Sequence, residues 1–213
     1  ALERLNRERE LISVYISGHP LDDYSIILTD VCSNHAPDLA DISPYKDKDI
    51  TVGGIVTSVR TGQTKTGKPY GIVKLEDYDG AGEIALFGDD WARHSGYFTI
   101  GNSLFITAHV EERHWKPGNY DLHITKIEFL SDVKENKIQR ITFTLNLDEL
   151  DDIAAQDLST HLQKAGKTEL YFNVREPKRS FNVTLRSQTP GIAVTKELVD
   201  FVKETPGISY KLN

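Results

Sequence analysis

Five short stretches rich in β-branched and aromatic residues follow one another between residues 50 and 130, and turn residues separate them. Such residues favour strands, whereas Gly, Asn and Asp mark the turns between strands. A short helical stretch, 89–98, lies between the third and the fourth of them. Five strands at this spacing predict a small closed barrel. The expected strands are 50–60, 70–77, 82–87, 103–113 and 120–130.

Two connecting loops of this segment are long, polar and partly basic. The loop TGQTKTGKP (61–69) joins the first two strands, and HWKPGN (114–119) joins the last two. This is the plan of the OB-fold, in which the face of strands 2 and 3 and these two loops hold single-stranded nucleic acid. We therefore predict an OB-fold domain over residues 47–132.

The flanking segments predict helices before the barrel and a second domain after it. Residues 1–46 read as a helical segment and linker, with apolar residues at helical spacing over 1–16 and a second short helix ending near Val31. Gly53-Gly54 in the first strand suggests a bulge or a tight coil.

After a polar linker (131–139), the period of the apolar residues changes. A strand, a helix over 147–166 ending at Gly166, a hairpin, a second helix and a closing strand predict a small βαββαβ-like domain over 138–213, with the topology of a split βαβ sandwich. The fold class expected for the whole chain is α+β and mostly β.

Composition gives expectations about membrane insertion, disulfide formation and the completeness of the sequence. The mean hydropathy is -0.40, and no apolar run approaches the ~20 residues of a membrane span. A single cysteine, Cys32, cannot form an internal disulfide, which favours a reducing cytoplasm. The chain begins at Ala1 and contains no methionine, which suggests a piece of a longer protein or a sequence from which residues were lost.

The charge of the chain argues against a general polyanion binder. The formal net charge is -7, whereas nucleic-acid-binding domains are usually basic. Residues 60–74 nevertheless carry four cations and no acid. We therefore expect any nucleic-acid contact to be local and modest.

The first loop and the strand after it supply the first set of candidate contacts. Lysines there would meet phosphates, and an aromatic ring would stack on a base, a contact worth ~1–3 kcal/mol. The alternative is a solvated loop whose lysines only keep it soluble. The candidates are Arg60, Lys65, Lys68, Tyr70 and Lys74.

The loop between the last two strands supplies a second set. A tryptophan between cations suits base stacking or a protein partner, unless its ring folds back over the mouth of the barrel. The candidates are Arg113, Trp115, Lys116 and Tyr120.

Other residues that could carry chemistry have simpler explanations. Phe87 and Trp91 border the expected face, but core positions fit them better. Asp77 and Asp79 suit a turn before Gly80 better than a metal site. The sequence contains no HExxH, GxSxG, P-loop or GxGxxG pattern, so we expect no catalytic residue, metal site or cofactor in this chain.

Three segments of the chain resemble a known protein family. The segment YISGHPL (15–21), the barrel sequence TKTGKPYGIVKLEDYDGAGEIALF and the tail VTKELVDFVKETPGISYKLN are similar to the C-terminal region of the bacterial DNA polymerase III alpha subunit. The similarity covers essentially the whole chain, and the junction of SGHPL with an OB barrel is its most specific part.

The resemblance implies a role in DNA replication. The parent would be a DNA-directed DNA polymerase, a nucleotidyltransferase whose palm-domain aspartates bind magnesium; those motifs do not appear in this sequence. In the family, the OB domain lies near the single-stranded template, and the last domain is associated with the tau subunit of the clamp loader. The sliding clamp and other replisome subunits would be partners of the parent. By place in the barrel, the positions carried over as DNA contacts are Lys65, Lys68, Arg113, Trp115 and Lys116.

Three functions remain open from the sequence. The first is a non-catalytic part of the polymerase that binds template DNA and docks replisome partners. The second is a pure protein-interaction module, with Trp115 and the second domain as contact surfaces. The third is an OB domain of the tRNA-binding or synthetase type, which gives no reason for the SGHPL junction.

Overall fold

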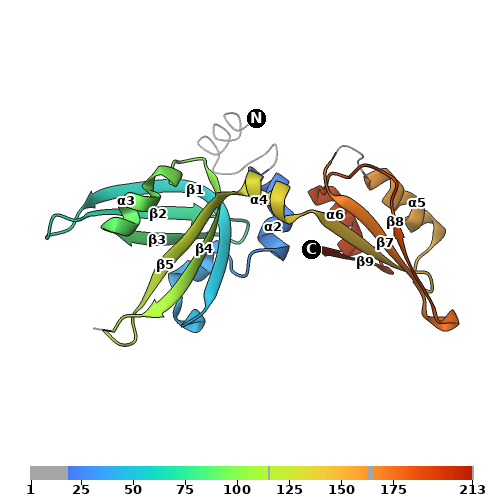
Figure 1. Cartoon of the computed structure of the whole chain (residues 1–213), viewed down its shortest axis with the longest axis horizontal. Helices are drawn as coiled ribbons and strands as arrows, with labels where there is room; N and C mark the ends of the chain where they lie inside the picture. Colours follow the sequence, from blue (N-terminus) through green and yellow to red (C-terminus); the bar gives the residue numbers. More distant parts are fainter. Residues whose placement is uncertain (1–18, 115, 163–165, 213) are drawn as a thin grey trace. The chain divides into compact units, whose positions relative to one another are not determined.

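The computed structural model describes residues 19–114, 116–162 and 166–212. Contacts divide the chain into two compact units, unit 1 (Ala1–Asp132) and unit 2 (Val133–Asn213) (Figure 1). The helix expected over 1–16 lies outside the described residues. Over the described part of the chain, every helix is too short or too polar to cross a membrane.

Unit 1 is built on one five-stranded antiparallel sheet with the order β3-β2-β1-β4-β5 (Figure 1). The long strand β1 pairs with β4 through its first half and with β2 through its second half, and a bulge at Thr57 separates the two halves. The predicted OB-type arrangement is confirmed, but within the described residues β3 and β5 remain edge strands that do not pair with each other, so the sheet is not closed by hydrogen bonds as expected. The strands are β1 (Asp49–Gln63), β2 (Pro69–Glu76), β3 (Ala81–Phe87), β4 (Ser103–Glu112) and β5 (Tyr120–Phe129).

The glycine pair of β1 serves close packing rather than a bulge. The register with β4 runs without a shift through both glycines. A Cβ on Gly53 would lie 2.4 Å from the side chain of Leu28, and one on Gly54 would lie 2.7 Å from the carbonyl oxygen of Glu76. The expectation of a bulge at this pair is therefore wrong, because the neighbouring elements need the space that a side chain would take.

Short helical elements cover this sheet and its ends. The elements before β1 are η1 (Asp22–Tyr24), α2 (Ser25–Asp30), η2 (Ala36–Ala40) and η3 (Ser43–Tyr45). Element η2 packs on β3. Between β3 and β4 lie α3 (Asp89–His94) and η4 (Ser95–Tyr97), and α3 contacts both edge strands of the sheet. The core is formed by alternate apolar residues of all five strands.

The segment expected to be a linker after the sheet is instead helical. Helix α4 (Leu130–Lys137) follows β5 directly. Leu130 and Val133, three residues apart and therefore on one side of the helix, are fully buried. The sequence pattern assigns Leu130 to the preceding strand, and the polar composition of 131–139 hides the apolar contact of Val133.

Unit 2 has the predicted βαββαβ element order but a different topology. Its sheet has the order β8-β7-β6-β9. The parallel strands β6 and β7 pair directly, so no strand lies between them and the βαβ unit is not split. The elements are β6 (Arg140–Asn146), α5 (Asp152–His161), β7 (Glu169–Glu176), η5 (Pro177–Arg179), β8 (Phe181–Arg186), α6 (Lys196–Glu204) and β9 (Ile208–Leu212).

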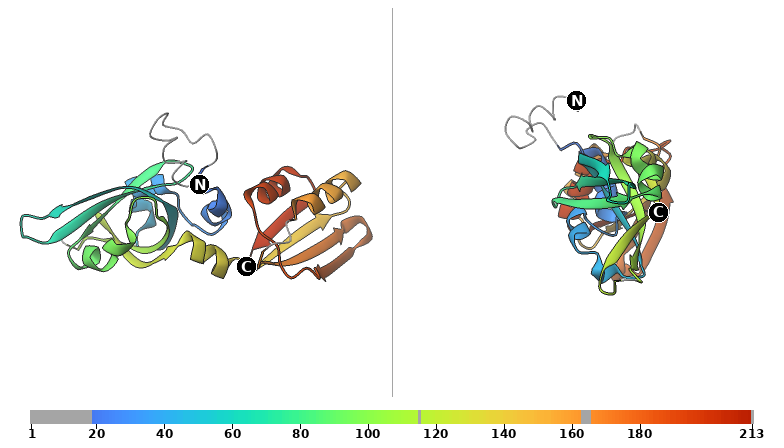
Figure 2. Two further views of the ribbon diagram at one scale, coloured as in Figure 1. Left: turned by 90° about the horizontal axis from the view of Figure 1, so that it is seen from above. Right: turned by 90° about the vertical axis from the view of Figure 1, so that its left-hand side faces the viewer.

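Both helices of unit 2 lie on the same face of this sheet (Figure 2). Helix α5 begins at a cap in which the Asp151 carboxylate accepts the backbone N–H of Ala154 at 2.6 Å. It ends at His161, earlier than predicted. Gly166 is not its cap; a Cβ there would lie 1.9 Å from the carbonyl oxygen of Ile192, so this glycine permits close contact between two backbone segments.

Candidate nucleic-acid interface

The outward face of strands β1, β2 and β3 is the part of unit 1 that could hold a ligand. In β2, Gly71, Val73 and Leu75 are buried, while the residues between them are at least partly exposed. Successive side chains of a strand point to opposite faces. The strand therefore presents Tyr70, Ile72 and Lys74 outward.

Pairing in register extends this outward face over three strands. Residues directly opposite each other on paired strands lie on the same face of the sheet. The resulting rows, read from β1 through β2 to β3, are Gly62–Tyr70–Phe87, Arg60–Ile72–Ala85 and Ser58–Lys74–Glu83.

Two aromatic rings occupy the end of this face nearest the β1–β2 loop. The ring centroids of Tyr70 and Phe87 are 5.9 Å apart, with an angle of 35° between the planes. The Tyr70 ring lies against Gly62, where a Cβ would come within 2.8 Å of the phenol oxygen. Phe87 is 52% exposed, which is unusual for so large an apolar side chain.

The expectation that Phe87 belongs to the core is therefore wrong. Ile84 and Leu86 of the same strand are buried, so alternation places Phe87 on the other face. That alternation was the signal available in the sequence. Trp91, by contrast, packs against the core as expected: its ring stacks on Phe98 at 6.1 Å.

Acidic partners partly neutralise the cations of this face. The Arg60 guanidinium donates to the Glu83 carboxylate at 2.6 Å, and both side chains are exposed. Lys74 is exposed and lies opposite Glu83 in the register. The face as a whole is therefore weakly charged, with the exposed Phe87 and the half-buried Tyr70 beside the cations.

The β1–β2 loop adds two lysines at the aromatic end of the face. The loop is held by hydrogen bonds from the Thr64 N–H to the Lys68 carbonyl (2.8 Å) and from the Lys68 N–H to the Thr64 hydroxyl (3.0 Å). Gly67, with φ of +78°, makes the turn. Lys65 and Lys68 are exposed, and the Lys68 stem passes close to Gly88, which directly follows Phe87. The structure thus places the candidates from the β1–β2 loop and its flanking strands on or beside one face of unit 1.

The β4–β5 hairpin is less suited to phosphate than the sequence indicated. Arg113 donates to the Asp121 carboxylate from Nε (2.8 Å) and a terminal nitrogen (2.5 Å), and this bond raises the pKa of the Arg113 guanidinium. Tyr120 is half-buried and packs against the core. Lys116 is exposed. Trp115 lies outside the described residues.

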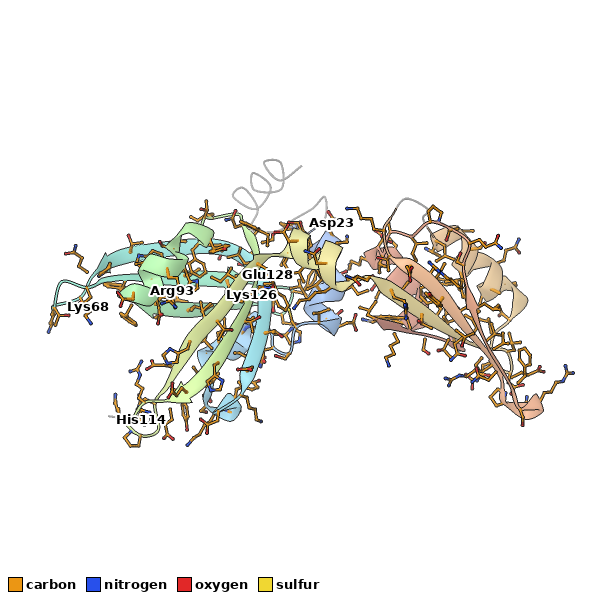
Figure 3. The ribbon with its side chains drawn as sticks, viewed as in Figure 1. Asp23, Lys68, Arg93, His114, Lys126 and Glu128 are labelled. Atoms are coloured by element: carbon orange, nitrogen blue, oxygen red, sulfur yellow. The ribbon has the colours of Figure 1, made fainter. Side chains whose placement is uncertain are left out.

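Acidic side chains also line the base of this hairpin. Glu112 forms an ion pair with Lys46 and accepts the backbone N–H of Gly118 at 2.8 Å; these bonds lower the pKa of its carboxyl group. Glu111 lies 3.5 Å from the exposed His114. Lys68 and His114 mark two separate projections of unit 1, so the hairpin tip is not a continuation of the aromatic end (Figure 3).

The Asp77–Asp79 pair serves the turn before Gly80. One carboxylate oxygen of Asp77 accepts the N–H groups of Asp79 (2.9 Å) and Gly80 (3.1 Å), and the other accepts the N–H of Ala36 (2.7 Å). His35 lies 2.7 Å from the Asp79 carboxylate, which makes a cluster with the geometry of a cation site. Because the buried Asp77 carboxylate already accepts three backbone donors, the turn interpretation is confirmed.

Two family models match the chain, one in each unit. Residues 50–130 match the OB-fold nucleic acid binding domain, and residues 141–213 match the C-terminal domain of the DNA polymerase III alpha subunit. The first match covers the sheet that carries the Tyr70–Phe87 pair. The second covers β6 through β9.

Relatives with curated descriptions agree with these models. A DNA polymerase III subunit alpha from Borreliella burgdorferi is 27% identical over 190 residues, which are 87% of this chain and 16% of that protein. The subunit from Vibrio cholerae is 24% identical over 200 residues, 92% of this chain and 17% of that protein. The chain therefore spans about a sixth of the length of these relatives.

Solved structures show a weaker likeness. The second OB-fold domain of replication protein A from Methanococcus maripaludis aligns with 39% of this chain and 85% of that chain, at 12% identity and a TM-score of 0.27. A likeness at that score is too weak to carry an argument.

Proposed function

The match of unit 2 and the relatives aligned over most of the chain place it with the C-terminal region of the DNA polymerase III alpha subunit, and from that premise we propose that unit 1 binds unpaired template DNA. One observation carries the proposal: the half-buried Tyr70 and the exposed Phe87 lie side by side on the outward face of β1–β3, beside the lysines of the β1–β2 loop. An OB-fold uses this face and this loop to hold single strands.

In the proposed complex, a base stacks on the aromatic pair while the backbone follows the cations. Stacking on an aromatic ring tolerates any base, because every base has a π-face. Lys65 and Lys68 lie where phosphates on one side of that base would pass, and Lys74 follows on β2. Arg60 must leave Glu83 to reach a phosphate, and an exposed ion pair of this kind costs only about 0–1 kcal/mol to break.

The test is a fluorescence anisotropy titration of oligo-dT with the full chain at low salt. We expect the Tyr70→Ala/Phe87→Ala variant to bind at least 5-fold more weakly, since each base–aromatic stack is worth about 1–3 kcal/mol. Tyr70→Phe keeps the ring and should keep the affinity. Phe181→Ala, which removes an exposed ring of unit 2, is the matched control. Undiminished binding by the double variant would overturn the proposal.

We further propose that unit 2 docks replisome partners, with the tau subunit of the clamp loader as the first candidate. Edge strand β8 exposes three apolar side chains, Phe181, Val183 and Leu185, at alternate positions. Their register partners on β7 include the half-buried Phe172 and Val174, so the stripe extends the helix-covered face of the sheet beyond the helices. Exposed apolar patches of this kind mark protein contacts.

Capture of the full chain by immobilised tau tests this docking. Phe181→Ala/Leu185→Ala should reduce the captured amount, whereas Tyr70→Ala/Phe87→Ala should leave it unchanged. The second candidate function, a pure protein-interaction module, is favoured by the ion-paired Arg113 and by the net charge of -7. Tau capture together with no oligo-dT binding at low salt would support it over the first.

Under the leading proposal this chain contributes DNA binding, and not chemistry, to a DNA-directed DNA polymerase. The chain spans about a sixth of its relatives, which leaves room for the nucleotidyl-transfer site elsewhere in such a protein. The magnesium of that reaction would be held by palm-domain aspartates outside these 213 residues. The sliding clamp and the other replisome subunits would be reached through that larger protein.

A further inference from the structure

Within the described residues of unit 2, no helix covers the face of the sheet opposite α5 and α6 (Figure 2). Ile141 and Phe143 of β6 are buried on the helix-covered face. Alternation therefore places Thr142 and Thr144 on the open face, together with the residues paired with them on the neighbouring strands. We call this surface the open face of unit 2.

Register pairing gives the composition of the open face. One row crosses all four strands, from Arg186 on β8 through Tyr171 and Thr142 to Lys211 on β9. The adjacent row consists of hydroxyl and amide side chains, namely Thr184, Asn173, Thr144 and Ser209. The flanking positions add Arg140, Glu169, Arg175 and Asn182.

The charge of the open face is opposite to that of the chain. The residues just named include four cations and one acid, on a chain with a net charge of -7. A cationic patch that a chain maintains against an acidic background is suited to an anionic ligand.

An aromatic ring lies among these cations. The guanidinium carbon of Arg140 is 4.6 Å from the centroid of the Tyr171 ring, and that of Arg186 is 5.9 Å from the same centroid. Both arginines also pair with Glu169, at 3.7 Å and 2.7 Å. All three charged side chains are exposed, so both ion pairs are weak and a ligand anion can replace Glu169.

A hollow of about 460 Å³ lies beside this cluster. Its volume is within the range of about 300–1,000 Å³ that is typical of small-molecule sites. Arg186 contributes a cation to the wall, and the Ser187 and Thr189 hydroxyls, 2.8 Å apart, contribute hydrogen-bonding groups. The hollow is lined by Glu169, Leu170, Arg186, Ser187, Gln188, Thr189 and Pro190.

We propose that the open face of unit 2 is a second binding site for single-stranded nucleic acid, separate from the face of unit 1. Phosphates meet Arg140, Arg186 and Lys211, a base stacks on Tyr171 once the arginines turn to the phosphates, and a neighbouring nucleotide enters the hollow. An acidic peptide would satisfy the arginines but would leave the ring and the row of hydroxyl and amide groups without partners. The combination of ring, cations and neutral polar groups therefore favours a polynucleotide.

Photocrosslinking of the full chain tests this site independently of unit 1. The probe is oligo-dT with scattered 5-iododeoxyuridine, and mass spectrometry locates the crosslinked peptides. We expect one crosslink at Tyr171 besides those at the Tyr70–Phe87 pair. Arg140→Gln/Arg186→Gln should reduce the Tyr171 crosslink at least 5-fold and leave the unit 1 crosslinks unchanged. Lys178→Gln/Arg179→Gln, which removes two exposed cations of η5, is the matched control and should change neither.

The possible outcomes of the crosslinking experiment distinguish the site in unit 1 from the site in unit 2. Crosslinks in unit 1 without one at Tyr171 would overturn the second site and leave the proposed function standing. A crosslink at Tyr171 without any in unit 1 would do the reverse. Fluorescein-labelled oligo-glutamate that binds the full chain and loses affinity in Arg140→Gln/Arg186→Gln, with no Tyr171 crosslink to DNA, would replace the proposal by an acidic-peptide site. Unchanged circular dichroism and thermal midpoints establish that both double variants fold.

Discussion

Phe87 and Trp91 are four positions apart, yet one ring faces solvent and the other closes the core. Phe87 is the last residue of β3, where alternation directs it outward beside Tyr70. Trp91 follows on α3, and its ring occupies the space left by Gly71, where a Cβ would lie 2.2 Å from the indole. At the scale of single residues, local geometry thus decides which aromatic ring is available to a ligand.

At the residue scale, the cations of the two loops also differ in whether an acidic side chain binds them. Lys65 and Lys68 are exposed, whereas Arg113 is bound to Asp121. We expect Lys65→Ala/Lys68→Ala to weaken oligo-dT binding and to reduce the slope of log affinity against log salt by about 1.4, since each phosphate contact to a single strand contributes about 0.7. Arg113→Ala should leave this slope unchanged. Titrations at several salt concentrations measure both, and a larger effect of Arg113→Ala would contradict the assignment.

A buried histidine at the end of α3 predicts a dependence of stability on pH. Burial, together with the neighbouring Arg93 cation, lowers the pKa of the His94 imidazole from its ordinary value of 6.5. Within the described residues, its Nε2 has no hydrogen-bond partner. Because the unfolded chain then binds the proton more readily than the folded chain, stability is full above pH 6.5 and falls as the pH drops toward the folded pKa.

We therefore expect the midpoint temperature of unfolding to decrease as the pH is lowered from about 7.5 to about 5.0. The decrease should be smaller in His94→Gln, which has no imidazole to protonate. Circular dichroism melts across this range provide the measurement. His114→Gln removes an exposed imidazole and serves as the control. If His94→Gln lost as much stability as the unaltered chain, His94 would not be the cause.

At the scale of elements, a glycine at position 82 allows η2 to pack closely against β3. A Cβ on Gly82 would lie 1.9 Å from the carbonyl oxygen of Ala36, so any side chain at this position must push η2 away from the strand. The Asp77 carboxylate fixes the same junction by accepting the Ala36 N–H at 2.7 Å. The covering segment and the sheet therefore form one packed element pair.

Gly82→Ala should destabilise unit 1 by roughly 1–3 kcal/mol, the usual cost of overpacking a tight site. Gly96→Ala is the matched control, because a Cβ there would meet no atom within 4 Å. Urea denaturation of both variants provides the comparison. Equal midpoints would show that η2 moves aside without cost.

At the scale of the whole molecule, net charge limits affinity. With a net charge of -7, long-range attraction to DNA is weak, and binding rests on a few local contacts. If about three phosphates are neutralised, a fourfold rise in salt should reduce the affinity of the full chain for oligo-dT by roughly 20-fold. Anisotropy at about 50 and about 200 mM salt measures this change, and salt-independent binding would exclude the phosphate contacts.

The sequence by itself determined most of the strands and their order, although it concealed helix α4. Strand alternation, turn residues and helix caps are local signals, so five strands in unit 1 and the βαββαβ order of unit 2 could be predicted, as could the turn role of Asp77 and the core position of Trp91. The exposed position of Lys65 and Lys68 on the first loop could also be predicted, because a place between two strands is a local property.

Only the tertiary structure decided how the elements pack and pair with one another. The ion pair of Arg113 and the packing of Tyr120 against the core depend on residues of other strands. The direct pairing of β6 with β7, and hence the open face that carries Tyr171, follows from the order of strands in the sheet. These contacts join residues of different elements, and periodicity records only which side of its own element a residue faces.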